Sequence, residues 1–159
     1  MTDESLRLRL ATSQDAYALW LWANDPETRA ASYARPVIPW AEHVRWLRGQ
    51  LESPSAVILI AETGYGQPSG SARFNTTDEW ATARLSYVMS PEVRGRGWSR
   101  QMIALATDWL PAHPPPAVVV AEVMTYNERS LRLFRALGWQ ESFAAEADVY
   151  RFQYSRRPR

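Results

Sequence analysis

The first third of the chain shows one alternating stretch followed by two stretches with helical spacing. Residues 6–10, LRLRL, alternate between apolar and charged side chains, the pattern of a half-buried strand. Residues 12–23 begin with capping side chains and carry Asp15 in the first turn, which predicts a helix. A loop is predicted over residues 23–39, and residues 40–51 have the apolar spacing of an amphipathic helix. The side chains expected to face inward are Tyr17, Trp20 and Leu21 in the first helix and Val44, Leu47 and Leu51 in the second.

Short apolar runs alternate with two more amphipathic stretches in the rest of the chain. The run AVILIAE is followed by the turn-forming segment TGYGQPSG, which predicts a hairpin. The predicted strands are residues 56–62, 69–75, 81–89, 117–123, 139–143 and 147–154, and the predicted helices are residues 96–110 and 128–137. Their expected inward side chains are Trp98, Met102, Leu105, Ala106 and Trp109, then Leu131, Phe134 and Leu137. This order predicts one domain, residues 1–159, of the α+β (α/β) class around a mixed sheet.

Composition narrows the chemistry that the chain can perform. The 159 residues are 46% hydrophobic and include eight tryptophans, so a folded core is expected. The absence of cysteine excludes disulfides, thiolate metal sites and cysteine nucleophiles. Because the chain has only two histidines, a histidine-built zinc site is disfavoured, and we expect no metal.

Charge and the N-terminal segment bear on partners and location. The net charge is +1, although all 18 basic residues are arginine, so a general nucleic-acid surface is not implied. The start, MTDESLRLRL, lacks the basic residues and apolar run of a secretory signal. No stretch approaches the roughly 20 apolar residues of a membrane span. We therefore expect a cytoplasmic protein with no membrane partner.

The segment Arg94-Gly95-Arg96-Gly97 stands between a predicted strand and a predicted helix. A helix N-terminus presents N–H groups without intrahelical partners and the positive end of the helix dipole. Glycines let a phosphate approach the backbone, and arginines add charge-assisted hydrogen bonds. The simpler alternative is a glycine-rich turn without a ligand. A Walker loop is excluded because the chain has no lysine, and a dinucleotide fingerprint lacks its third glycine.

Two motifs resemble the GNAT acetyltransferase superfamily. The first is the Arg/Gln-x-x-Gly-x-Gly/Ala signature before the helix that follows the fourth strand. Here Arg94-Gly95-Arg96-Gly97-Trp98-Ser99 matches it, with serine in the last small position. The second motif is downstream, where Asn127, Ser130, Phe134, Gly138 and Trp139 have the family's spacing. The predicted order of elements resembles this fold across nearly the whole chain.

The resemblance implies a fold and a co-substrate. The fold is a mixed sheet of about seven strands, flanked by about four helices, in which the fourth and fifth strands splay apart. The pantetheine arm of acetyl-CoA would enter between these strands, and its pyrophosphate would meet the glycine-rich segment. The residues that we assign to acetyl-CoA on this basis are Tyr87, Val88, Met89, Arg94, Gly95, Arg96, Gly97, Trp98, Ser99, Asn127, Ser130 and Phe134. For Asn127, a simple helix cap is the alternative, and both roles can coexist.

The chemistry implied is acetyl transfer to an amine, which must lose a proton to attack. Glu122 is our candidate base, since some protein N-acetyltransferases of the family carry a catalytic glutamate there; an ordinary strand-end carboxylate is the alternative. The Met89 N–H is the candidate donor to the thioester oxygen. Phe134 stands where many members carry a tyrosine acid, so Tyr126 or water must protonate the leaving thiolate, if any acid exists.

The acceptor is expected between the first two helices. There the series Trp-x-Asn-Asp … Glu-His-x-x-Trp-Leu resembles acetyltransferases of nucleotide-linked amino sugars, as in pseudaminic acid biosynthesis, and also those of protein N-termini. It favours the amino sugar. Arg29 and Arg35 would meet nucleotide phosphates, while Tyr33 and Trp40 would stack on a ring. The candidate acceptor residues are Asn24, Arg29 and His43.

Three functions are therefore weighed. An N-acetyltransferase of a small-molecule amine comes first, and a protein N-terminal acetyltransferase comes second. A non-catalytic acyl-CoA-binding sensor is the third, because Phe134 replaces the tyrosine and Arg84 stands where glutamate is common in the family. The expected partner is a small-molecule amine, with no nucleic acid, and the chain is expected to be a monomer or homodimer.

Overall fold

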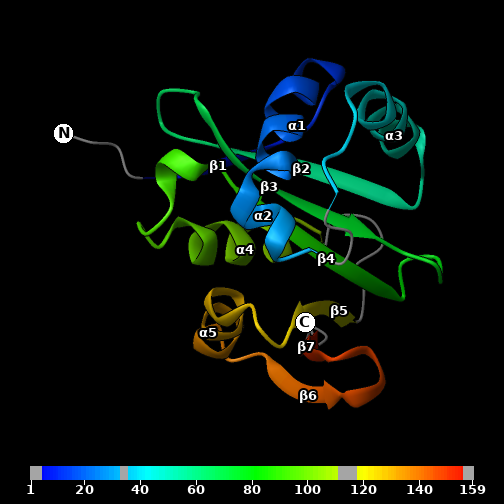
Figure 1. Cartoon of the computed structure of the whole chain (residues 1–159), viewed down its shortest axis with the longest axis vertical. Coiled ribbons are helices and arrows are strands. Elements are labelled where there is room, and N and C mark those ends of the chain that lie inside the picture. Colours follow the sequence, from blue (N-terminus) through cyan, green and yellow to red (C-terminus); the bar gives the residue numbers. More distant parts are fainter. Residues whose placement is uncertain (1–4, 33–35, 111–117, 156–159) are drawn as a thin grey trace.

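The computed structural model describes residues 5–32, 36–110 and 118–155, which fold around one seven-stranded sheet (Figure 1). The strands are β1 (Arg7–Leu10), β2 (Ala56–Glu62), β3 (Pro68–Asn75), β4 (Thr82–Met89), β5 (Val118–Met124), β6 (Gln140–Ala144) and β7 (Val149–Ser155). The α-helices are α1 (Ala16–Asn24), α2 (Pro26–Ala30), α3 (Trp40–Glu52), α4 (Trp98–Trp109) and α5 (Glu128–Ala136). Short 3-10 turns are η1 (Ser13–Asp15), η2 (Pro91–Val93) and η4 (Ala145–Ala147).

The sheet has the order β1-β2-β3-β4-β5-β7-β6. All neighbouring strands are antiparallel except β4 and β5, which run parallel because α4 connects them. The mixed seven-stranded sheet predicted from the sequence is thus confirmed. None of the helices in the described ranges is both long and apolar enough to cross a membrane.

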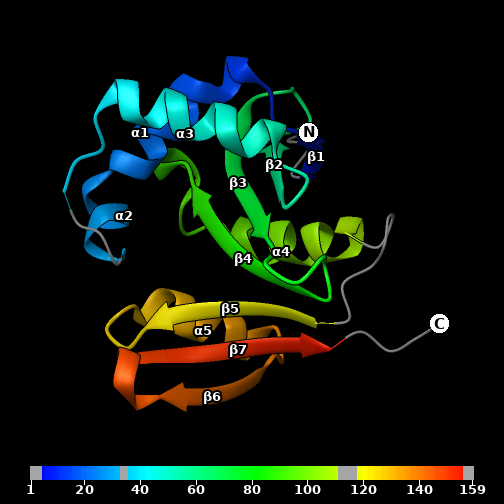
Figure 2. The same cartoon turned by 90° about the vertical axis from the view of Figure 1, so that its right-hand side faces the viewer.

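Helices cover both faces of the sheet (Figure 2). On one face, α1 and α3 bury Leu19, Trp22 and Leu47 against Ile58 and Ile60 of β2. On the other face, α4 and α5 pack into a larger core with the alternate residues of the central strands. Cavities and ligand sites in such a sandwich form where the sheet opens rather than where it is covered.

The inward faces of α1 and α4 differ from those expected. In α1, the residues Tyr17 and Trp20 were expected in the core, yet they pack against each other and Trp40 near the surface. Tyr17 is 61% exposed and Leu21 is 46% exposed. The residues buried in these two helices are Leu19 and Trp22 of α1 and Met102, Ile103, Ala106 and Thr107 of α4. Three side chains that were expected to face inward lie at the surface instead: Leu105 and Trp109 of α4, and Leu51 of α3.

The segment predicted as a loop after α1 contains the short helix α2. Asp25 caps it, because its carboxylate accepts a hydrogen bond from the Thr28 N–H at 3.3 Å. Pro26 follows in the first helical position, where a missing N–H has no cost. The Asp-Pro pair is a signal for the start of a helix. Apolar periodicity could not predict α2, because none of its residues is buried.

Candidate active site

The sheet opens between β4 and β5. The two strands pair over only three residues, from Thr82 opposite Val118 to Arg84 opposite Val120. Beyond that point β4 continues beside β3 and β5 continues beside β7, so the strands separate (Figure 2). A cavity of about 510 Å³ lies at this notch, within the size range of ligand sites. The strand residues that line it are 85–89 of β4, 121–124 of β5, and Ser71 and Arg73 of β3.

The glycine-rich segment forms one wall of the cavity at the N-terminus of α4. Gly97 is the N-cap residue and has φ 75°, and Gly95 has φ 80°. No side chain caps this end of α4, so its first N–H groups face the cavity side without a side-chain partner. Left-handed backbone at both glycines explains why small residues without Cβ strain are needed here. The wall therefore fits an anion such as a pyrophosphate.

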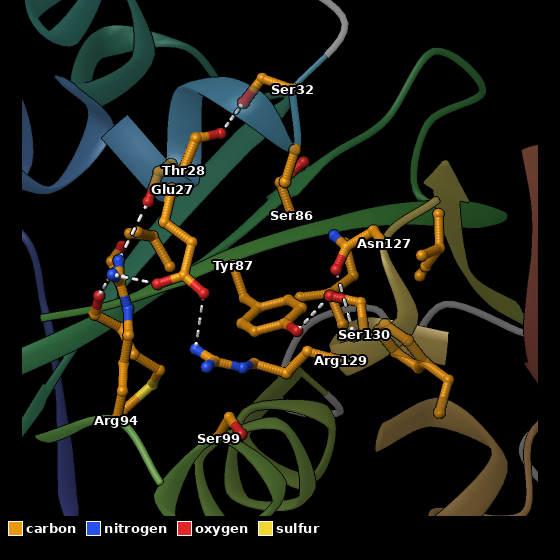
Figure 3. A pocket seen from close by; sticks show the side chains of 18 of the residues that line it. Glu27, Thr28, Ser32, Ser86, Tyr87, Arg94, Ser99, Asn127, Arg129 and Ser130 are labelled. Atoms are coloured by element: carbon orange, nitrogen blue, oxygen red, sulfur yellow. Dashed lines mark hydrogen bonds and ion pairs between the residues drawn. The ribbon is translucent and has the colours of Figure 1, made fainter. Parts of the chain in front are cut away.

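The Arg94 side chain is largely buried and is in contact with acceptors of the protein. Its guanidinium donates to Asp25 at 2.8 Å. It also donates to Glu27 at 2.9 Å and to the Thr28 hydroxyl at 3.1 Å (Figure 3). Glu27 forms a second ion pair with Arg129 of α5 at 3.3 Å. A carboxylate thus lies between two cations on the wall where the sequence predicts phosphate binding.

The start of α5 forms the opposite wall. Asn127 caps this helix by accepting a hydrogen bond from the Ser130 N–H at 3.3 Å, as the capping alternative predicts. The Ser130 hydroxyl lies 2.6 Å from the Tyr87 hydroxyl (Figure 3). The Tyr87 ring meets Phe134 edge-on, with 6.1 Å between the ring centres. Burial raises the pKa of the Tyr87 phenol, and its contact with Ser130 opposes that shift only in part. Tyr87 therefore holds its proton more firmly than an ordinary tyrosine does.

Glu122 lines the cavity and is held by two arginines. Its Oε1 atom accepts hydrogen bonds from Arg84 at 3.2 Å and from Arg151 at 3.0 Å. The side chain is only 14% exposed. Arg84, which stands where glutamate is common in the resembling family, is thus one of the two arginines in contact with Glu122.

Several predicted site residues lie outside the cavity lining. Tyr126 is 44% exposed and is not part of the lining. Arg96 extends over the ring of Trp98 at 5.4 Å instead of entering the cavity. Asn24 clamps the backbone of Ile38 through two hydrogen bonds, of 2.7 and 3.0 Å.

His43 and Arg29, the other two candidate acceptor residues, have different surroundings. His43 is 3% exposed, and its Nε2 lies 2.8 Å from the Ala16 carbonyl oxygen. Burial lowers its pKa, and the bond to Ala16 opposes the shift. Arg29 does line the cavity, but it donates to the Ala23 carbonyl at 2.5 Å and to the Ser32 hydroxyl at 3.2 Å. His43 thus has a structural role, and Arg29 shapes the cavity wall at α2.

Residues 5–140 match a family model described as an acetyltransferase (GNAT) domain. The chain belongs to the GNAT acetyltransferase family. This confirms the predicted enzyme class, an N-acetyltransferase, with acetyl-CoA as its co-substrate. No curated protein matches the chain. Within the described residues, no three histidine, aspartate or glutamate side chains are grouped as a metal site.

Solved structures share the fold of this GNAT domain. A spermidine N-acetyltransferase from Vibrio cholerae, in complex with CoA and spermine, has a TM-score of 0.86 at 17% identity, with 94% of this chain and 95% of that chain covered. A domain from Methanocaldococcus jannaschii has a TM-score of 0.83 at 18% identity, covering 97% and 100%. An aminoglycoside acetyltransferase in complex with coenzyme A has a TM-score of 0.79 at 20% identity, covering 96% and 95%.

Three charged lining residues, Glu27, Arg73 and Arg129, were not singled out from the sequence. Arg129 follows the Asn127 cap by two residues, so its place in the first turn of α5 was a usable signal. Glu27 and Arg73 carry no such signal, because only the packing of α2 and β3 brings them to the cavity. For Tyr87, the sequence indicated its backbone but not its phenol.

Proposed function

We propose that this GNAT domain transfers an acetyl group from acetyl-CoA to a primary amine of a small molecule. The observation that supports the proposal is a single cavity with two parts that are lined by different elements. One part joins the notch to the uncapped N-terminus of α4 and the cations Arg94 and Arg129. The other part extends to α2 and β3, where Ser32 and Ser71 line it. A co-substrate and an acceptor can therefore meet at the notch.

The first part fits acetyl-CoA. Arg94, Arg129 and the first N–H groups of α4 are donors for a pyrophosphate. The separated edges of β4 and β5 present backbone groups that no partner strand uses across the notch, and these suit the amides of a pantetheine arm. Asn127 and Ser130 lie beside that arm's path at the start of α5.

The acceptor amine must be neutral when it attacks the thioester. Glu122 is the base in this proposal, because it lines the notch and because Arg84 and Arg151 fix its orientation. Tyr87 is the acid for the leaving thiolate in this proposal, because it places a hydroxyl in the lining where Phe134 supplies none. Tyr126, the acid predicted from the sequence, lies outside that lining.

Among small-molecule amines, a nucleotide-linked amino sugar is the first candidate. The Trp-x-Asn-Asp series supports it, as does the presence of Arg29 in the lining. Tyr33 and Arg35, expected to contact such a ligand, lie outside the described residues. The enzymes named above for spermidine and aminoglycosides support a small-molecule amine over a protein N-terminus. A protein N-terminal acetyltransferase is the second candidate, and an acyl-CoA sensor the third.

The test measures coenzyme A release from acetyl-CoA with three acceptor classes in parallel: sugar-nucleotide amines, N-terminal peptides and polyamines. We expect turnover with small-molecule amines. Turnover on peptides alone would reverse the order of the first two candidates. Tight acetyl-CoA binding in calorimetry without turnover on any acceptor would identify the sensor and contradict the proposal.

A further inference from the structure

Arg73 is a cavity-lining cation whose Nε has no protein partner. It lies on β3, paired in register with Ile58 of β2 and Ser86 of β4. Its guanidinium carbon lies 4.9 Å from the ring centre of Trp46 on α3. The Nε atom is buried and has no hydrogen-bond partner among the described residues. None of the ion pairs within that part of the chain includes Arg73.

A partly buried guanidinium in this state is costly for the fold. Its Nε–H loses water without gaining an acceptor, and the face of an aromatic ring attracts the charge but accepts no such hydrogen bond. Burial lowers the pKa of Arg73, which records the same penalty. Such an unsatisfied group in a cavity wall is explained if a ligand supplies the acceptor.

The carboxylates of the cavity are already paired. Glu122 is bound by Arg84 and Arg151, and Glu27 by Arg94 and Arg129. The charged residues that line the cavity are Glu27, Arg29, Arg73, Arg94, Glu122 and Arg129. Four cations thus face two carboxylates, and both carboxylates are engaged.

We propose that Arg73 binds an anionic oxygen group, a carboxylate or a phosphate, on the acceptor amine. The site includes two hydroxyl donors on the same face of the sheet, Ser86 opposite Arg73 and Ser71 two residues before it, and both line the cavity. Arginine offers the fork of donors that matches either group. This inference rests on the proposed function and specifies its substrate class, an amine that carries an acid group.

The inference separates this chain from the polyamine enzymes that share its fold. A polyamine carries only positive charge, so Arg73 would repel it at close range in a partly buried site. An acidic amine places its negative group on Arg73 and leaves its amine free to reach Glu122 at the notch. Arg73 therefore sets which amines are accepted, and it takes no part in the chemical step.

Two matched pairs of acceptors test this in the wild-type protein: glucosamine 6-phosphate against glucosamine, and lysine against cadaverine. Each pair differs only in the acid group, and the two pairs distinguish phosphate from carboxylate. Binding to the protein with coenzyme A present is measured by calorimetry, and turnover is measured with acetyl-CoA. We expect at least one acidic amine to exceed its counterpart without the acid group by about tenfold or more in affinity and in kcat/KM.

Variants assign the preference to Arg73. Arg73→Met should abolish it, Arg73→Lys should keep part of it, and Arg48→Met, an exposed change on α3, should leave it intact. Equal binding within both pairs in the wild type, or an equal loss for all four amines in Arg73→Met, would overturn the inference. Arg73-dependent binding without turnover contradicts the proposed function alone. Turnover that is indifferent to the acid group contradicts the inference alone.

Discussion

The carboxylate of Asp25 lies 2.8 Å from the guanidinium of Arg94, so an ion pair joins the start of α2 to the loop before α4. Burial, the largest single influence, acts to raise the pKa of Asp25, but the hydrogen bonds from Arg94 and the Thr28 N–H together lower it. This ion pair thereby joins the wall proposed for the co-substrate to the helix that borders the proposed acceptor part of the cavity.

The Glu27 carboxylate competes with phosphate for Arg94 and Arg129, and its removal should strengthen acetyl-CoA binding. Both cations lie within ion-pair distance of Glu27, at 2.9 and 3.3 Å. Exposed pairs of this kind contribute about 0–1 kcal/mol, so Glu27→Gln should tighten binding by about two- to fivefold in calorimetry. The gain should shrink at high salt.

The matched control for this change is Glu42→Gln, which removes an exposed carboxylate from α3 outside the cavity lining. It should leave acetyl-CoA affinity unchanged. If both variants bind acetyl-CoA more tightly by the same factor, the change in net charge explains the effect and the position of Glu27 does not. If Glu27→Gln weakens binding, Glu27 orders the two arginines rather than blocking them.

Gly97 provides a test of the phosphate wall. A Cβ at this position would meet no atom within 4 Å, so the strain of a substitution comes from φ 75° alone. Gly97→Glu adds a negative charge at the helix N-terminus and should weaken acetyl-CoA binding by about tenfold or more. Gly97→Asn tolerates the left-handed backbone and adds no charge. It should bind much better than the glutamate variant, and unchanged acetyl-CoA affinity in a folded Gly97→Glu protein would exclude this wall.

The sequence predicted most strands and the glycine-rich turn that lines the cavity, because both leave local signals. Short β-branched runs such as AVILIAE mark buried strands, and the Arg94–Gly97 segment marks a strand-to-helix turn. The helix faces were harder, since α1 is apolar on every side and periodicity cannot choose between Trp20 and Trp22. There the packing of Trp20 against Trp40 on α3 decides.

The acceptor part of the cavity was the least predictable. The sequence predicts the strand that carries Arg73 only as half of a hairpin, and the packing of that strand in the sheet brings Arg73 to the cavity. His43 and Asn24 belong to a suggestive local motif, yet tertiary hydrogen bonds to Ala16 and Ile38 occupy them. Long-range pairing of charges and donors therefore limits inference from the sequence here.

If Glu122 takes the amine proton, Glu122→Gln should lower kcat by about 10²-fold or more and leave acetyl-CoA affinity nearly intact. The amide retains an oxygen acceptor for Arg84 and Arg151, so the local structure should persist. The loss should diminish at high pH, where the amine is already neutral. A pH–rate profile with the shape and height of the wild type would remove Glu122 from the mechanism.

The buried imidazole of His43 predicts a loss of stability on mild acidification. Burial lowers its pKa below the ordinary value of 6.5, with the bond to Ala16 opposing the shift, so the unfolded chain binds a proton first as pH falls. Stability is fully present above pH 6.5 and declines as pH falls toward the folded-state pKa. Denaturant unfolding should therefore show that the free energy of unfolding decreases more between pH 7.5 and pH 5.5 for the wild type than for His43→Gln. The carboxylates and His113 are common to both proteins and cancel in this comparison, so an equal decrease in both would mean that His43 keeps its ordinary pKa in the fold.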